Sequence, residues 1–195
     1  NDALERLRIQ HDAALFLPLS VTGSHVGPRH CHTSGRNLDI SFRAWVAAQR
    51  HMGFEMDPRE LDEHETAVLT EVTSWWKANR NWMQTADILR LDSADPAVLA
   101  EQQLSKDKTR FVVFAGKAAT SAQIAPRPLR LTGMLADAMY RINLTNRNTL
   151  HRLSRGTTAL KTDALELSGA YLMRNGVTLP WSFPDRMWVL EGTKL

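Results

Sequence analysis

The chain has 195 residues, 43% of them hydrophobic, which is enough for one domain or for two small domains with a core. Its formal net charge is +3, and its arginines and lysines are spread along the chain instead of forming a block. Nucleic-acid binding normally requires a clustered basic surface, so this pattern disfavours it. No apolar run approaches the roughly 20 residues of a membrane-spanning helix, which disfavours a membrane protein.

The chain contains a single cysteine, Cys31. An internal disulfide and a cage of several thiolate ligands are therefore excluded, and we expect a reducing, cytoplasmic location. The sequence begins at Asn1 without a methionine, and a helical pattern starts at once with Asp2. A natural N-terminus is usually a loose polar tail, so we expect the sequence to be a piece of a longer protein.

The first half of the chain combines long helical periodicities with short apolar runs. Apolar residues at steps of three and four predict a helix over 4–15, and the apolar run 15–27 predicts a buried strand. Another helix is predicted within 38–53, and a short strand is predicted at 54–56.

The longest helix is predicted to start at Asp62, because Asp62 and Glu65 have the spacing of a capping box. Helices thus alternate with strands, which predicts a parallel sheet covered by helices. Two parallel strands alone would leave their outer edges unpaired. We therefore expect further strands from the rest of the protein or from another copy of the chain.

The second half, from Leu91 onward, consists of short alternating segments separated by Gly, Pro and Asn. This pattern predicts a small antiparallel β-sandwich. We expect the segment 168–176 to be a loop or a single helical turn. The strands are predicted at 110–117, 128–134, 139–146, 157–167 and 186–195.

The densest group of reactive side chains lies in the stretch TGSHVGPRHCHTSGR, residues 22–36, at the end of a predicted strand. Sites on parallel sheets are built at this end of the strands. Three interpretations remain open: a pocket for a sugar or an anion, the structural hydrogen bonds of a tight loop, and a metal site. The reactive residues are His25, His30, Cys31, His32 and Arg36.

A metal site in this stretch would use His25, His30 and His32 as ligands. Their spacing matches no familiar zinc pattern, and the stretch contains no carboxylate that could join them, so we expect no metal. Cys31 beside two histidines could serve as a nucleophile, but nothing else in the sequence indicates a Cys–His pair. We expect it to be a bystander thiol.

Two pairs of acidic residues are further candidates. Asp2 and Glu5 stand at the start of the first helix, where the helix dipole favours an acid whatever its function. Glu55 and Asp57 follow the second predicted strand, but an aspartate before a proline is more typical of the start of a turn.

The adjacent tryptophans Trp75 and Trp76 allow two interpretations. They could form a platform on which a sugar stacks, or they could pack in the interior of the protein. Their helical spacing with Val72, Asn79 and Met83 favours interior packing.

Several stretches of the chain carry a family resemblance: NDALERLRIQ, GSHVGPRHCHTSGR, SFRAWVAAQRHMGFEMD, WWKANR, ILRLDSADPAV, PLRLTGM and MYRINL. In this order they resemble the C-terminal third of the retaining α-galactosidases of glycoside hydrolase family 36. The resemblance covers essentially the whole chain. Several motifs in the right order make it far more specific than one short pattern.

The resemblance implies a fold of two parts. The first is the C-terminal part of a (β/α)8 TIM barrel, with its last two strands and last three helices. The second is an antiparallel β-sandwich domain. The resemblance places residues 1–88 in the catalytic barrel and residues 89–195 in the sandwich. It also implies that the chain starts just after the sixth barrel strand.

The resemblance also implies hydrolysis of terminal α-galactosyl residues of oligosaccharides such as melibiose or raffinose, with retention of configuration and without a cofactor. The acid/base aspartate is expected just before Asn1 and the nucleophile further upstream. Neither catalytic residue would then lie on this chain, which should be inactive alone. We expect the residues Asp2, His25, His32 and Arg36 to lie near the active site.

A different function also fits the pattern of the second half. This half could be a non-catalytic module that binds carbohydrate or forms an interface between subunits. Appreciable binding of galactose by the second half would favour this alternative.

Overall fold

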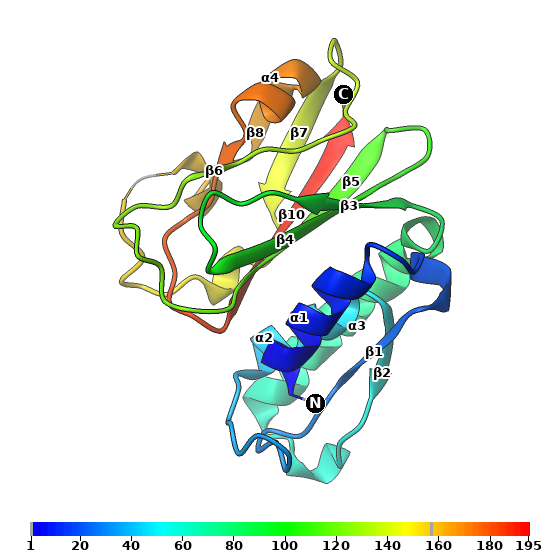
Figure 1. Ribbon diagram of the computed structural model, residues 1–195. Helices are drawn as coiled ribbons and strands as arrows, with labels where there is room; N and C mark the ends of the chain where they lie inside the picture. The colour runs from blue at the N-terminus through cyan, green and yellow to red at the C-terminus, as the bar shows by residue number, and fades with distance from the viewer. Residues whose placement is uncertain (1, 157) are drawn as a thin grey trace. The chain divides into compact units, whose positions relative to one another are not determined.

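The structure, a computed structural model, describes residues 2–156 and 158–195. The chain divides into two compact units, Asn1–Thr85 and Ala86–Leu195 (Figure 1). None of the helices formed by the described residues is both long and apolar enough to cross a membrane.

The first unit contains a pair of parallel strands and three helices, as the sequence predicts. Its elements are α1 (Ala3–Ala13), β1 (Gly23–Val26), α2 (Ile40–Ala48), β2 (His51–Phe54) and α3 (Glu63–Met83). Strand β1 pairs with β2 in parallel, with Gly23 opposite His51 and Val26 opposite Phe54. The three helices lie together on the same side of the strand pair (Figure 1).

Helix α2 is the most deeply buried element of the first unit, since all nine of its residues are buried. Its Trp45 packs edge to face against Trp75 of α3, with ring centroids 5.0 Å apart. Helix α3 begins with the predicted capping box. Asp62 accepts a hydrogen bond from the backbone N–H of Glu65, and the Glu65 carboxylate accepts one from the backbone N–H of Asp62.

The predicted strand at 15–27 is wrong over most of its length. Only the last part of this run forms β1. Pro18 precedes a short 3-10 helix at Leu19–Val21 and interrupts the extended backbone.

The predicted strand at 54–56 is also misplaced, because β2 covers His51–Phe54. Helix α2 ends at Ala48, and the chain turns into the strand almost immediately. Arg50 fixes this turn, because its guanidinium donates hydrogen bonds to the carbonyl oxygens of Gln49 and Gln10 at 2.9 and 3.1 Å.

The second unit is built from two antiparallel sheets. The larger sheet has the strand order β3-β4-β5-β10-β7-β8, and β6 pairs with β9 in a small second sheet. The elements are β3 (Asp87–Leu91), β4 (Val98–Leu104), β5 (Arg110–Lys117), β6 (Pro128–Leu129), β7 (Met139–Leu144), β8 (Leu165–Ser168), α4 (Gly169–Arg174), β9 (Val177–Thr178) and β10 (Arg186–Lys194).

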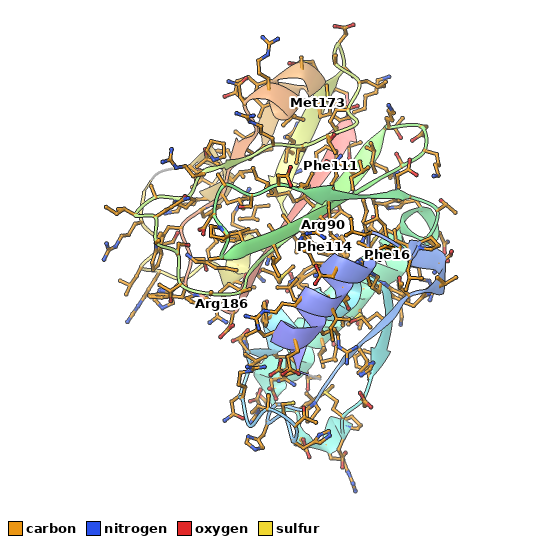
Figure 2. All side chains as sticks on the ribbon, in the orientation of Figure 1. Phe16, Arg90, Phe111, Phe114, Met173 and Arg186 are labelled. Atoms are coloured by element: carbon orange, nitrogen blue, oxygen red, sulfur yellow. The ribbon has the colours of Figure 1, made fainter. Side chains whose placement is uncertain are left out.

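One hydrophobic core holds this unit together, with side chains from both sheets and from α4. Phe111 and Tyr140 face each other in it with ring centroids 5.9 Å apart, and Met173 packs against its edge (Figure 2). The Tyr140 hydroxyl donates a hydrogen bond to the carbonyl oxygen of Lys108 at 2.9 Å. Gly192 of β10 lies against the Phe111 ring, since a Cβ at position 192 would be 2.1 Å from it.

The structure confirms three of the predicted strands, at β5, β7 and β10, and the single helical turn at α4. The predicted strand at 128–134 shortens to β6. The one at 157–167 contributes only its end to β8, and residue 157 lies outside the described residues.

The sequence analysis did not predict β4 as a strand, because its centre is polar. Glu101, Gln102 and Gln103 are all buried there. The Gln102 side chain bonds to the backbone of Thr132 as a neighbouring strand would. Its Nε2 donates to the carbonyl oxygen of Thr132, and its Oε1 accepts from the backbone N–H of the same residue, both at 3.0 Å.

Candidate functional site

The loop that follows β1, residues 27–39, carries four of the residues that the sequence analysis put forward: His30, Cys31, His32 and Arg36. Two backbone hydrogen bonds close it, from Cys31 N to Arg36 O at 3.0 Å and from Gly35 N to Cys31 O at 2.8 Å. Gly35 has a φ of 70°, a conformation that glycine adopts at little cost. The closed loop presents Ser34 and Arg36 to the first turn of α1.

Asp2 caps α1 and holds this loop. Its Oδ1 accepts a hydrogen bond from the backbone N–H of Glu5 at 2.9 Å. Its Oδ2 accepts hydrogen bonds from Ser34 Oγ and Arg36 Nε, both at 2.5 Å. Arg36 Nη2 also donates to Glu5 Oε1 at 3.2 Å.

These contacts set the charge of Asp2, which is only 5% exposed. Burial raises the pKa of its carboxyl, but the hydrogen bonds from Arg36, Ser34 and the Glu5 backbone outweigh burial and lower the pKa to about 2. Asp2 is therefore a fixed anion near neutral pH. Such a group is a poor proton donor and a good structural anchor.

His25 belongs to a separate cluster. Its Nε2 lies 2.6 Å from Arg6 Nη2 and also contacts the carboxylate of Glu55. Burial and the positive charge of Arg6 lower the pKa of His25 below its usual value of 6.5, against the opposing effect of Glu55. The imidazole therefore loses its proton more readily than that of a free histidine.

A buried ion-pair network fixes both ends of the loop after β1. Arg43 of α2, which is 3% exposed, donates to the carbonyl oxygens of Gly27 and Leu38 at 2.8 and 3.0 Å. It also donates to Glu65 Oε1 at 2.7 Å, and Arg29 donates to both oxygens of the same carboxylate. The loop is thus tied to α2 and α3 at its beginning and at its end.

His30 and His32 are exposed on the loop. His30 Nδ1 lies 3.1 Å from Asn37 Oδ1, as expected for a polar residue that stabilises a tight loop. Within residues 2–156 and 158–195, no three side chains of His, Cys, Asp or Glu are grouped so that they could hold a metal ion.

Cys31 is buried, and its sulfur lies 3.2 Å from Thr33 Oγ1. Hydrogen bonds from Ser34 and Thr33 lower the pKa of the thiol to about 6. These partners are hydroxyl groups, whereas a Cys–His nucleophile would have an imidazole beside the sulfur. Neither of these two partners can serve Cys31 as a general base.

A small pocket lies between this loop and the start of α1. Asp2, Cys31 and Arg36 meet there, whereas His25 and His32 do not line it. The three arginines of its lining are all paired with carboxylates, Arg29 and Arg43 with Glu65 and Arg36 with Asp2 and Glu5. The lining residues are Asp2, Ala3, Gly27, Pro28, Arg29, Cys31, Arg36, Leu38 and Arg43.

The remaining candidates have structural roles. Asp57 accepts a hydrogen bond from the backbone N–H of Arg59 at 2.9 Å, in the predicted turn. Trp76 Nε1 donates to the carbonyl oxygen of Arg50 at 2.9 Å. Together with the Trp45 contact of Trp75, this bond supports interior packing of the tryptophan pair.

The two units match two different family models. Residues 1–86 match the family described as Melibiase, and residues 98–190 match the Glycosyl hydrolase family 36 C-terminal domain. The chain belongs to glycoside hydrolase family 36. Both halves of the family resemblance seen in the sequence are thereby confirmed.

Two known alpha-galactosidases are similar to this chain over most of its length. It is 29% identical over 191 residues to an alpha-galactosidase of Escherichia coli, which covers 95% of this chain and 27% of the relative. It is 32% identical over 148 residues to the probable alpha-galactosidase G of Aspergillus terreus, which covers 73% of this chain and 20% of the relative.

Solved structures of family 36 have the same fold. The alpha-galactosidase AgaA from Geobacillus stearothermophilus, in complex with raffinose, is 25% identical with a TM-score of 0.82, and the match covers 100% of this chain and 25% of that chain. The predicted fold class, the end of a TIM barrel followed by an antiparallel β domain, is confirmed. The chain spans about a quarter of the length of the first of these relatives.

Proposed function

We propose that the chain is the C-terminal part of an α-galactosidase that hydrolyses terminal α-galactosyl residues of oligosaccharides. The supporting observation is that family 36 members match both units of the chain. Solved structures of AgaA hold raffinose and stachyose, so we propose oligosaccharides of this kind, melibiose included, as the substrates. The cytoplasmic location expected from the single cysteine stays a prediction.

The proposed reaction is a double displacement that retains configuration. It requires two carboxylates about 5 Å apart, one as nucleophile and one as acid/base, and no cofactor. We assign neither role to this chain. Asp2 has a pKa of about 2 and is occupied by three hydrogen bonds, which disfavours it as an acid at neutral pH.

Instead, the chain would contribute positioning residues. The bond between Asp2 and Arg36 fixes the first turn of α1 against the loop after β1. A catalytic group carried by the chain segment that leads into α1 would be held in place by this contact. A misplacement of about 1 Å can cost about a hundredfold in rate, so the contact would support catalysis without touching the substrate.

The strand pair also requires a partner. Within the described residues, β1 and β2 pair only with each other, so each has an unpaired outer edge. Barrel strands have two neighbours. We infer that the rest of the barrel covers these edges, and a second copy of the chain is the alternative.

Activity of the isolated chain tests the first part of the proposal. The purified 195-residue protein is incubated with an aryl α-galactoside, and no turnover is expected. Turnover that Asp2→Asn abolishes, and that persists after further purification, would show that a catalytic carboxylate is on the chain.

A chimera tests whether the chain belongs to an active α-galactosidase. The aligned C-terminal segment of the Escherichia coli relative is replaced with this chain, and hydrolysis of melibiose and raffinose is measured. We expect activity that the truncated relative lacks. Arg36→Gln in the chimera should lower kcat by about 10- to 100-fold with little change in KM, whereas Thr193→Ala should have no effect. A folded but inactive chimera would contradict the proposal.

A further inference from the structure

A second pocket lies entirely in the second unit. It is formed by the start of β4, the end of β5, the loop between β5 and β6, and the segment before β10. Its empty volume, including the open mouth, is about 420 Å³, but its enclosed part is only water-sized. Its lining includes the polar and aromatic residues Asp95, Lys117, Gln123, Trp181 and Trp188.

Two buried polar atoms of this lining have no hydrogen-bond partner among the described residues. They are Trp188 Nε1, in a side chain that is 2% exposed, and Gln123 Oε1. The other end of the Gln123 amide is fixed, because Nε2 donates to the carbonyl oxygen of Ala94 at 2.8 Å. An unsatisfied buried polar atom destabilises the folded protein, so a donor and an acceptor left open in one pocket favour a polar ligand.

Of the three charged residues in the lining, Lys117 and Asp95 have partners within the unit, and Arg127 is exposed. Lys117 Nζ donates to the carbonyl oxygen of Ser182 at 2.8 Å. Asp95 accepts hydrogen bonds from the Ser121 hydroxyl and from the backbone N–H of Ala97. The buried open positions are therefore one neutral donor and one neutral acceptor, and a hydroxyl group has the chemistry to accept from the indole and to donate to the amide.

An aromatic surface adjoins these open positions. Trp181 is half-buried in the lining, and its ring is held edge to face against Phe183, with centroids 4.6 Å apart. Sites of this kind combine apolar walls with a few placed polar groups that fix the orientation of the ligand. Because the enclosed part admits only a group the size of a hydroxyl, the body of the ligand would stay at the mouth.

We propose that the second unit binds a neutral saccharide at this pocket, with one sugar hydroxyl inserted between Trp188 and Gln123. This site is independent of the proposed hydrolysis. It would give the antiparallel domain its own carbohydrate contact, separate from the catalytic barrel.

The test follows indole N–H resonances of the whole 195-residue chain by nuclear magnetic resonance during titration with galactose or raffinose. Trp188→Phe identifies the Trp188 resonance and removes the donor while it keeps an aromatic ring. Gln123→Ala removes the acceptor on an external loop, so it probes the site even if the core variant folds poorly. Trp76→Phe is the matched control, since it removes an indole of the first unit.

We expect the Trp188 resonance to shift on titration, with a dissociation constant in the millimolar range, about 1–10 mM. Gln123→Ala and Trp188→Phe should weaken binding about tenfold, and Trp76→Phe should leave it unchanged. No shift of the Trp188 resonance up to about 0.1 M sugar, or equal binding by the Gln123→Ala variant, would overturn the proposal. A shift caused by sulfate but not by sugar would overturn it as well.

Discussion

Arg36 donates a hydrogen bond from Nε to Asp2 Oδ2 at 2.5 Å, and this contact joins the loop after β1 to the first turn of α1. The two residues are separated by 34 positions in the sequence. The contact gives Asp2 the properties of a fixed anion, because the partner charge is permanent and the carboxylate is buried.

The Asp2 carboxylate should make the stability of the chain depend on pH in acid. Its folded-state pKa of about 2 lies below the usual value of 3.8, so the ionised form is favoured in the folded state. This contribution, about 2 kcal/mol, is fully present above about pH 4 and is lost as the pH falls through about 2.

Urea unfolding at several pH values measures this effect. Asp2→Asn should flatten the difference in unfolding free energy between pH 5 and pH 2.5, compared with the unchanged protein. Asp12→Asn, further along the same helix, serves as the control. An equal acid slope in the Asp2→Asn variant would show that other carboxyl groups dominate.

Glu65 should be the residue of α3 whose charge matters most for stability. Glu65→Gln would leave the buried guanidinium of Arg43 without its carboxylate, at a cost of about 3 kcal/mol. Glu63→Gln, in the same helical turn but exposed, should change the unfolding free energy by less than about 0.5 kcal/mol. Similar losses for the two variants in thermal unfolding would contradict this account.

Gly192→Ala should destabilise the second unit by about 2–3 kcal/mol. The added Cβ would lie 2.1 Å from the Phe111 ring, so the ring or the strand must move within a packed core. Thr193→Ala, at the next and exposed position of β10, is the control. Unchanged chemical denaturation of Gly192→Ala would show that the core relaxes without cost.

The charges of Arg6 and Glu55 should each change the pKa of the neighbouring His25. Arg6→Met removes a positive charge and should raise the pKa of His25, whereas Glu55→Gln removes a negative charge and should lower it. Histidine ring resonances recorded over a pH series measure both changes. An unchanged pKa in both variants would mean that burial alone controls this imidazole.

The parallel pair and its helices were predictable because their apolar residues follow simple periods. The limits of the strands were not predictable. Helix α2 ends at Ala48 without a glycine, and Arg50 fixes the turn partly through the carbonyl oxygen of Gln10, which is 40 residues away. Strand β4 was missed for a similar reason. Gln102 can be buried in it because the backbone of Thr132, 30 residues away, satisfies both ends of its side-chain amide.

The candidate site was predictable in part. Asp2 stands out as the acid that starts a helix, and Arg36 as part of a dense polar stretch, but no local pattern shows that they pair. Arg43 could have been found, since a single arginine within an apolar helix indicates a buried partner. That partner, Glu65, is 22 residues away, and the sequence analysis placed it only in the capping box.

The position of β10 in the larger sheet has a consequence for synthesis on the ribosome. This strand is made last, yet it lies between β5 and β7 and pairs with both. The two halves of the sheet therefore cannot join until residues 186–194 have left the exit tunnel. Until then, nascent chains would expose two open strand edges, and exposed strand edges favour pairing with other chains and aggregation.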